Sequence, residues 1–221
     1  MPPLADAAAT QAVHVAHHFD DAEQQREAST LGMWAFLVQE VMFFGGLFTC
    51  YVVYRTLHPD GFAHASHHLD VVLGTINTAA LITSSLTMAL AVWASQMGRR
   101  RMLLLCIFVT ALLGAVFLGI KSYEYWHKFQ EHLVPGPYFV WEGAEAHTAE
   151  MFFSLYFALT GLHALHMVIG LGIMAWIFWM AWSGRVGPAY HAPVELSGLY
   201  WHFVDIVWIF LFPLLYLIGR H

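Results

Sequence analysis

A carboxylate lies in the middle of an otherwise apolar stretch of this sequence. Glu40, preceded by Gln39, falls within residues 31–54, which are long enough to cross a bilayer as a helix. At 1.5 Å per residue, Glu40 lies roughly 14 Å into that helix, near the centre of a ~30 Å hydrocarbon layer. An ionised carboxylate there costs about 2.5 to 3.5 kcal/mol. We therefore expect Glu40 to be protonated, paired, or turned toward protein and water.

Other polar side chains recur at helical spacing in the later apolar stretches. His163 and His166 lie one turn apart, and His202 and Asp205 are close enough on one helix face for an imidazole-carboxylate hydrogen bond. Asn77 begins a further stripe with a threonine and two serines. We expect these stripes to converge inside a helical bundle and to face Glu40.

One stretch carries both charges on one face. Lys121 and Glu124 are three residues apart near the end of a helix and can pair. For Lys121 we favour an interfacial position in which the side chain reaches water. Glu124 is kept as a candidate for the buried network, at the outer end of the helix.

Histidines in mid-membrane are either hydrogen-bonded packing residues, proton-handling groups or ligands of a metal or haem. A haem needs two histidines on different helices at matching depth, and His163 and His202 are expected to differ in depth by on the order of 10 Å. Cys50 and Cys106 both lie in apolar stretches, as expected for packing residues. We therefore assign no metal site and no catalytic residue, and a haem-carrying cytochrome b subunit becomes the less favoured class.

The composition indicates that membrane-spanning helices position these residues. Of 221 residues, 59% are hydrophobic and 11% charged, which is typical of an integral membrane protein, and no basic patch points to nucleic acid. The predicted fold is all-α, a polytopic bundle of five transmembrane helices over residues 31–221 behind a mobile cytoplasmic tail at residues 1–30. The helices are predicted at about residues 31–57, 71–94, 102–126, 150–182 and 197–218.

Basic residues indicate the orientation. Arg99, Arg100 and Arg101 form a triplet in a short loop, on the same side as the N-terminus. Short loops rich in arginine stay in the cytoplasm. The N-terminus is therefore predicted to be cytoplasmic.

Several motifs occur in a fixed order along the chain. They are Glu40-Val-Met-Phe-Phe-Gly-Gly-Leu-Phe, Asn77-Thr78, Tyr123-Glu124-Tyr125, Thr160-Gly-Leu-His-Ala-Leu-His166 and Tyr200-Trp-His-Phe-Val-Asp-Ile-Val-Trp208. Together they resemble subunit III of the haem-copper cytochrome c oxidases, from the first expected helix to the last. Seven-helix members of that family have two further helices before the one that matches residues 31–57, and five-helix bacterial versions also occur.

The resemblance implies a subunit without redox centres that stabilises the catalytic subunit, supports its proton uptake and binds phospholipid. Haem and copper then belong to partner subunits I and II, with a small subunit IV or a respiratory supercomplex as further partners. The carboxylate matching Glu40 is the carbodiimide-reactive group of the family. The expected location is the bacterial cytoplasmic membrane. A quinol oxidase subunit III or a nitric oxide reductase accessory protein stays open as an alternative.

Overall fold

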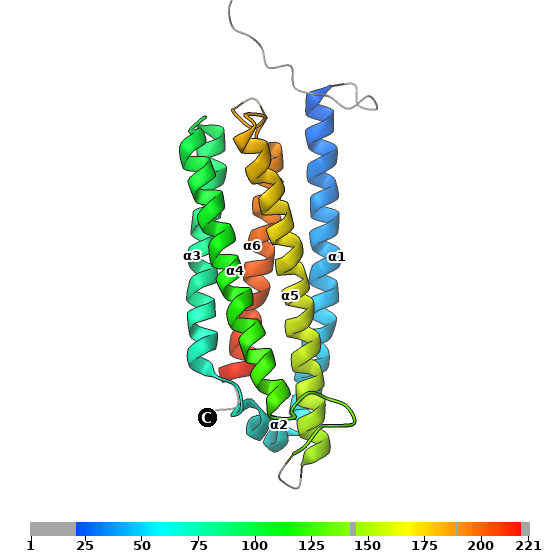
Figure 1. Cartoon of the computed structure of the whole chain (residues 1–221). Coiled ribbons are helices and arrows are strands. Elements are labelled where there is room, and N and C mark those ends of the chain that lie inside the picture. The colour runs from blue at the N-terminus through cyan, green and yellow to red at the C-terminus, as the bar shows by residue number, and fades with distance from the viewer. Residues whose placement is uncertain (1–20, 142–144, 189, 218–221) are drawn as a thin grey trace, which may run out of the picture.

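The computed structural model describes residues 21–141, 145–188 and 190–217, and their regular structure is helical (Figure 1). Five helices are long and apolar enough to cross a membrane. This confirms the predicted all-α fold with five candidate spans. The elements are α1 (Ala22–Leu57), α2 (Pro59–Ser66), α3 (Val71–Gln96), α4 (Arg100–Gln130), α5 (Ala146–Trp182), α6 (Ala192–Phe212) and the π-helical turn η1 (Pro213–Leu217).

The first helix begins earlier than the sequence pattern predicts. Asp21 caps α1 by accepting a 2.7 Å hydrogen bond from the backbone N–H of Gln24. The following residues, rich in Ala, Glu and Gln, are good helix formers. Residues 22–30 are therefore helical, which corrects the expected tail over that range, and residues 1–20 lie outside the described residues.

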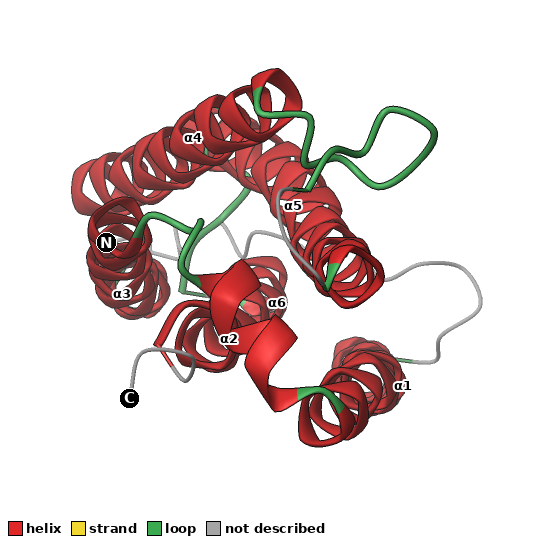
Figure 2. Ribbon diagram, turned by 90° about the horizontal axis from the view of Figure 1, so that it is seen from below, coloured by secondary structure: helices red, strands yellow, loops and turns green. Residues whose placement is uncertain are grey.

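A short helix that the sequence analysis missed, α2, crosses one end of the bundle (Figure 2). It begins at Pro59 and buries Phe62, whose ring lies 5.5 Å from the rings of Tyr51 and Phe152. A Cβ on Gly61 would lie 2.5 Å from Thr148, so this glycine lets α2 approach α5. The sequence pattern did not predict α2, because its few apolar residues are interspersed with histidines.

The helices differ in how deeply they lie within the bundle. In the most apolar window of α6, 56% of the residues are buried, against 22% in α1. Helix α6 packs against α1, α3 and α5, whereas α1 packs against α2, α5 and α6 at the edge of the bundle (Figures 1 and 2). The centre of the fold is thus close to α6, and α1 is its most peripheral span.

Trp201 of α6 fills the middle of the core. A Cβ on Gly114 or Gly170 would lie within 3.0 Å of its ring, so these glycines make room for the indole. The indole N–H donates a 3.1 Å hydrogen bond to the Ser84 hydroxyl. Gly170 therefore allows close helix packing, whereas a Cβ on Gly172 would meet no atom within 4 Å.

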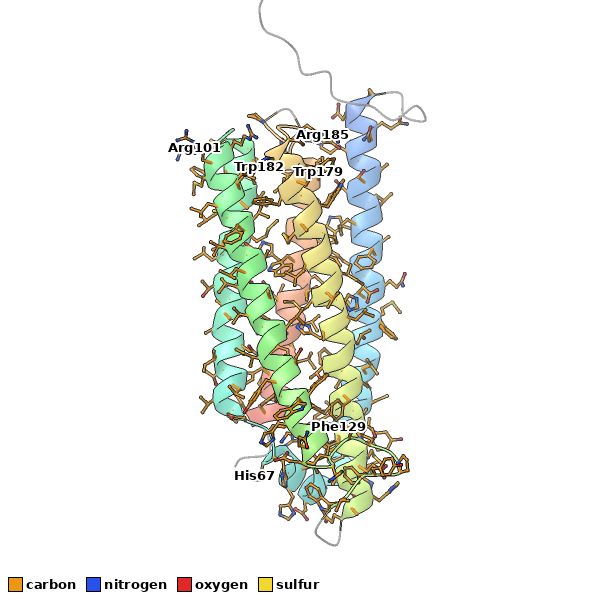
Figure 3. The ribbon with its side chains drawn as sticks, viewed as in Figure 1. His67, Arg101, Phe129, Trp179, Trp182 and Arg185 are labelled. Carbon is orange, nitrogen blue, oxygen red and sulfur yellow. The ribbon has the colours of Figure 1, made fainter. Side chains whose placement is uncertain are left out.

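Arginine and tryptophan gather at one end of the bundle, opposite α2 (Figure 3). Arg185 lies 4.8 Å from the Trp179 ring, and the guanidinium of Arg100 donates hydrogen bonds to the carbonyls of Ala181 and Trp182 at the end of α5. Such residues suit the region between hydrocarbon and water. This end is the one predicted to face the cytoplasm.

Candidate functional site

Glu40 is paired with a histidine of another helix. Its Oε2 lies 3.3 Å from Nε2 of His166 on α5, and the two side chains are 11% and 10% exposed. The geometry is not that of an aligned hydrogen bond, since Oε2 has no hydrogen-bond partner among the described residues. The ring of Phe44 lies 5.4 Å from the imidazole. Glu40 is thus buried against protein, one of the outcomes that its depth required.

The other nitrogen of His166 determines how protons are arranged in this pair. Nδ1 lies 2.9 Å from the carbonyl oxygen of Leu162, and a carbonyl only accepts, so Nδ1 carries hydrogen. A neutral imidazole then leaves Nε2 bare, facing Glu40. A pair with no net charge would hold one further proton, either on the Glu40 carboxyl or on Nε2 of an imidazolium.

His163 lies one turn away but in a different environment. It is 1% exposed, and its ring lies 5.4 Å from Phe117 and 5.2 Å from Trp208. Neither ring nitrogen has a hydrogen-bond partner within the described part of the chain. The histidine packs as expected, but the expected hydrogen bond is missing there.

The α6 pair predicted from the sequence does not form. Nδ1 of His202 lies 2.7 Å from the Ser85 hydroxyl of α3 instead of bonding Asp205. Ser85 also interacts with Asp205 electrostatically, yet neither carboxylate oxygen has a well-aligned hydrogen bond to any described residue. The predicted imidazole-carboxylate bond is therefore absent, because the imidazole of His202 bonds a hydroxyl of α3 instead.

Asn77 is likewise buried, with 0% exposure, and both atoms of its amide lack a hydrogen-bond partner among described residues. The hydroxyl of Thr78 accepts a 3.1 Å hydrogen bond from the indole of Trp208. The α3 stripe therefore faces α6, as a buried polar stripe should, but Glu40 pairs only with His166 among the predicted residues. The predicted single polar core is divided into separate groups.

The largest polar group surrounds Lys121, and we call Lys121, Glu124, Tyr156 and Tyr216 the lysine cluster. Nζ of Lys121 donates to Glu124 Oε2 at 2.8 Å, to the Tyr216 hydroxyl at 2.9 Å and to the Tyr156 hydroxyl at 3.1 Å. Tyr216 in turn donates to Glu124 Oε1 at 2.6 Å. Lys121 and Glu124 are each 3% exposed, so the predicted interfacial lysine is wrong.

Aromatic rings complete the surroundings of this lysine. The ammonium lies 5.1 to 5.5 Å from the ring centroids of Tyr125, Tyr156, Trp208 and Tyr216. Ring faces attract a cation most strongly where water is excluded. All three ammonium hydrogens have partners, so the charge is stabilised without reaching water. The sequence analysis did not identify Tyr216 or Tyr156 as members of a polar site. Tyr216 lies in η1, three residues after Pro213, and no spacing rule connects it with Lys121. Tyr156 could have been found, because it lies one turn before Thr160 on the polar stripe of α5.

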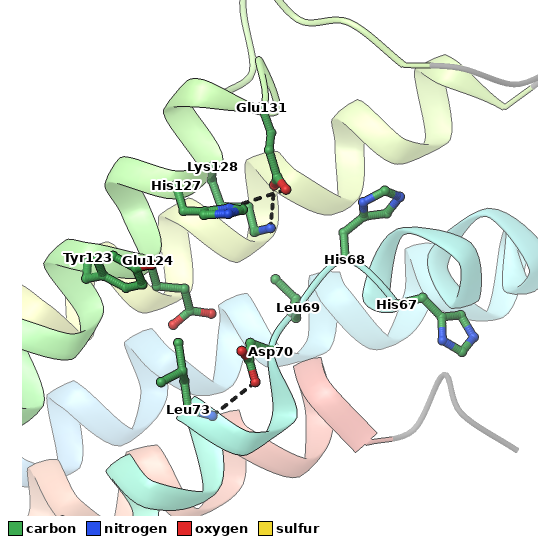
Figure 4. A pocket seen from close by; sticks show the side chains of 10 residues that line it. All are labelled: His67, His68, Leu69, Asp70, Leu73, Tyr123, Glu124, His127, Lys128 and Glu131. Atoms are coloured by element: carbon green, nitrogen blue, oxygen red, sulfur yellow. Dashed lines mark hydrogen bonds and ion pairs between the residues drawn. The ribbon is translucent and has the colours of Figure 1, made fainter.

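A polar pocket of about 340 Å³ lies beside Glu124 at the end of the bundle that carries α2 (Figure 4). Glu131 accepts from Lys128 at 2.6 Å and lies 3.3 Å from His127. Burial alone would raise the pKa of Glu131, but these cations outweigh it and the pKa lies below its ordinary value. Burial, and then Lys128, lower the pKa of His68.

An apolar groove runs between α1 and α6, on the side of Glu40. Its volume is about 520 Å³, and its walls include Leu37, Val41, Phe44 and Phe203. Trp34 at its end also borders a shallow hollow that contains Arg26, Glu27 and Glu195. Within the described residues, no group of three or more His, Cys, Asp or Glu side chains is placed to hold a metal ion.

Comparison with known proteins gives consistent results. A family model described as cytochrome c oxidase subunit III matches residues 9–220. Cytochrome c oxidase subunit 3 of Thermostichus vulcanus is 32% identical over 206 residues, covering 91% of this chain and 92% of that protein. The Synechocystis protein of the same name is 35% identical, covering 85% and 74%. The probable quinol oxidase subunit 3 of Staphylococcus epidermidis is 31% identical, covering 93% and 96%.

Proposed function

The chain belongs to the cytochrome c oxidase subunit III family, and from this premise we propose that it keeps an exchangeable proton and a phospholipid beside the catalytic subunit. As subunit III of a haem-copper oxidase it is a multi-pass membrane protein that associates with other oxidase subunits. The finer proposal depends on one observation, the 3.3 Å contact between the buried side chains of Glu40 and His166.

The pair suits proton storage better than proton conduction. Because either partner can hold the proton while the pair stays neutral, moving it across 3.3 Å creates no unpaired charge in hydrocarbon. Glu40 is flanked by groove residues Leu37, Val41 and Phe44. A lipid chain in that groove would keep water from the pair, and Arg26, Glu27 and Glu195 at its end suit a headgroup that carries both charges.

Redox chemistry is assigned to the partners. We propose that haem and copper are held by subunits I and II, that this chain contributes no catalytic residue, and that the assembly lies in the bacterial cytoplasmic membrane with the arginine-rich end of the bundle facing the cytoplasm. A small fourth subunit or a supercomplex is a further partner in this proposal. A haem Soret band in the absorption spectrum of the purified chain would contradict it.

The electron donor is proposed to be cytochrome c, on the basis of the glutamate at position 40. The second candidate is quinol, because the Staphylococcus epidermidis relative named for quinol oxidase matches at 31% identity, beside 32% for the Thermostichus vulcanus relative named for cytochrome c oxidase. A third possibility is that the chain is an accessory protein of a nitric oxide reductase. The catalytic subunits that copurify with this chain distinguish the three.

A hydrophobic carbodiimide tests the proposed proton on Glu40, because it reacts with protonated carboxyls inside the membrane. We expect labelling of the wild-type chain, loss of the label in Glu40→Gln, and retention of the label in Glu124→Gln. Glu124 is the control, since it is a buried carboxyl of the same chain, 3% exposed, that is paired with the ammonium of Lys121 at 2.8 Å. Equal labelling of Glu40→Gln and the wild type would disprove the proton store.

A further inference from the structure

Two polar side chains in the middle of the bundle have no partner in the described part of the chain. Asn77 of α3 is 0% exposed and His163 of α5 is 1% exposed, and none of their four side-chain nitrogen and oxygen atoms has a hydrogen-bond partner among the described residues. The buried hydroxyls of Ser84 and Thr110, by contrast, each donate a 2.8 Å hydrogen bond to a carbonyl of their own helix. Buried polar groups without a partner are rare in folded proteins, and each of them lowers stability. Asn77 and His163 therefore need a partner that the described residues do not provide.

Trp208 of α6 places the two side chains in the same layer of the core. Its ring centroid lies 5.2 Å from that of His163, and its indole N–H donates to the hydroxyl of Thr78, the residue after Asn77. Both side chains are enclosed by the helices of this chain, since neither is more than 1% exposed. Lipid and the helices of other subunits therefore do not reach their polar atoms.

A change of protonation state does not satisfy these atoms. The amide of Asn77 does not titrate, and it has an NH₂ group that donates and an oxygen that accepts. A neutral imidazole has one N–H that donates and one bare nitrogen that accepts. Loss of charge, which would lower the cost of a buried carboxylate, therefore leaves the needs of Asn77 and His163 unchanged.

The combination of donors and acceptors indicates the chemical class of the ligand. A metal ion or another cation would bind the Asn77 oxygen and the bare imidazole nitrogen, but it would leave both N–H groups unpaired. An anion would leave both acceptors unpaired. Water donates and accepts, and inside proteins it typically forms about three hydrogen bonds to such groups. We propose that Asn77 and His163 bind internal water beside Trp208.

The lysine cluster lies next to this site but is not part of it. The ammonium of Lys121 is 5.2 Å from the Trp208 ring, and its three hydrogens already have partners. His163 lies one turn before His166 on α5 and interacts electrostatically with both His166 and Lys121. Water at His163 thus provides a proton donor and acceptor inside the bundle, one turn from the pair of Glu40 and His166. This role rests on the proposed function, whereas the binding of water does not.

Magnetisation transfer from water to buried ring nitrogens tests the site in the intact oxidase. With ¹⁵N in the histidines and tryptophans of this chain, we expect solid-state NMR to show transfer to the His163 ring at least about threefold faster than to the Trp201 indole. Trp201 is the matched control, because it is 0% exposed and its N–H donates to Ser84 at 3.1 Å. His163→Gln assigns the histidine signal by its loss. Equal transfer to the two rings would overturn the proposal.

Electron cryomicroscopy of the assembled oxidase gives an independent test. In a map that resolves water elsewhere in the bundle, we expect density about 2.7 to 3.2 Å from the Asn77 amide and from a ring nitrogen of His163. Asn77→Leu, which has the same branched shape, should lose the density at position 77. Density only about 2.0 to 2.1 Å from His163 would indicate a metal ion and contradict the proposal, as would a lack of density at one of the two side chains. Carbodiimide labelling of Glu40 tests the proposed function separately, because it does not depend on this water.

Discussion

The two buried acid-base pairs of this subunit are built in opposite ways. Lys121 and Glu124 belong to one helix, and hydroxyls from α5 and η1 satisfy the remaining hydrogen bonds. Glu40 and His166 come from two helices, and the Glu40 oxygen nearest the imidazole lacks an aligned hydrogen bond with any described residue. The first arrangement holds its charges in place. In the proposed function, the second leaves a proton that either partner can hold.

The difference teaches that burial alone does not identify a functional group in a membrane protein. The side chain of Glu124 is less exposed than that of Glu40, at 3% against 11%, yet every contact of Glu124 stabilises one fixed charge state. A group that exchanges a proton needs two states of similar free energy. We propose that the incompletely paired Glu40 and His166 meet that requirement, whereas the fully hydrogen-bonded lysine cluster does not.

The largest expected effect concerns Lys121. Lys121→Met leaves the Glu124 carboxylate buried without its cation, so the free energy of unfolding should fall by about 3 to 5 kcal/mol. The double variant Lys121→Met, Glu124→Leu should recover most of that loss, because no uncompensated charge is left. Denaturant titration of the purified subunit measures both. A cost below about 1 kcal/mol for the single variant would mean that the cluster is hydrated and not sealed.

Tyr216 should have the next largest effect. Tyr216→Phe removes a donor to a carboxylate and an acceptor for an ammonium, which should lower the free energy of unfolding by about 1.5 to 3 kcal/mol. Tyr200→Phe is the matched control, because its hydroxyl donates to a neutral backbone carbonyl, that of His166, at 3.0 Å. The control should cost about 0.5 to 1.5 kcal/mol. Equal losses would contradict the view that hydrogen bonds to the charged groups of the lysine cluster contribute more to stability than a hydrogen bond to a neutral carbonyl.

Glu40 should matter much less to stability. Glu40→Gln keeps a hydrogen-bonding group of the same shape beside His166, so we expect a change of less than about 1 kcal/mol in the same titration. The functional loss should appear during turnover, as faster inactivation of the oxidase. If Glu40→Gln destabilised the subunit as strongly as Lys121→Met, the proposed difference between the two pairs, fixed charges in one and an exchangeable proton in the other, would be wrong.

The smallest expected effect is a pH dependence at the end of the bundle that carries α2. The pKa of His68 is lowered, so the unfolded chain takes up a proton before the folded chain as the pH falls below about 6.5. The pKa of Glu131 is also lowered, so its contribution is present above about pH 4.3 and is lost as the pH falls further. Both lowered pKa values make the free energy of unfolding fall in acid. The loss is less than about 1 kcal/mol for the partly exposed ion pairs of Glu131. Lys128→Met should reduce the Glu131 step, as thermal unfolding at several pH values would show.

Helical spacing predicts contacts within one helix well and contacts between helices poorly. The three-residue separation of Lys121 and Glu124 correctly predicted that they pair, but not that the pair is buried. Its burial depends on Tyr216, which lies beyond Pro213 in a turn that no spacing rule connects to α4. A proline lacks the N–H of a regular helix, and the wider π-helical turn follows from it.

The same limit explains the outcome at the other predicted residues. Glu40 and His166 were both recognised as costly residues, but their pairing depends on the register of α1 against α5. A bond between His202 and Asp205 was predicted because they share a helix face, whereas His202 lies 2.7 Å from the hydroxyl of Ser85 on a separate helix. Long apolar stretches fixed the number of spans, since lipid requires a helix for each. Side-chain partners across helices require the packed structure.

The hydrogen bond between Tyr216 and Glu124 also orders events during synthesis. The two residues are 92 positions apart, and a ribosome adds about 5 to 20 residues per second. Glu124 is therefore made about 5 to 20 s before the hydroxyl that completes its surroundings. A nascent chain arrested at Phe212 should keep α4 crosslinked to the insertion machinery, and extension past Tyr216 should release it. The formation of η1 would then mark the moment at which the lysine cluster closes.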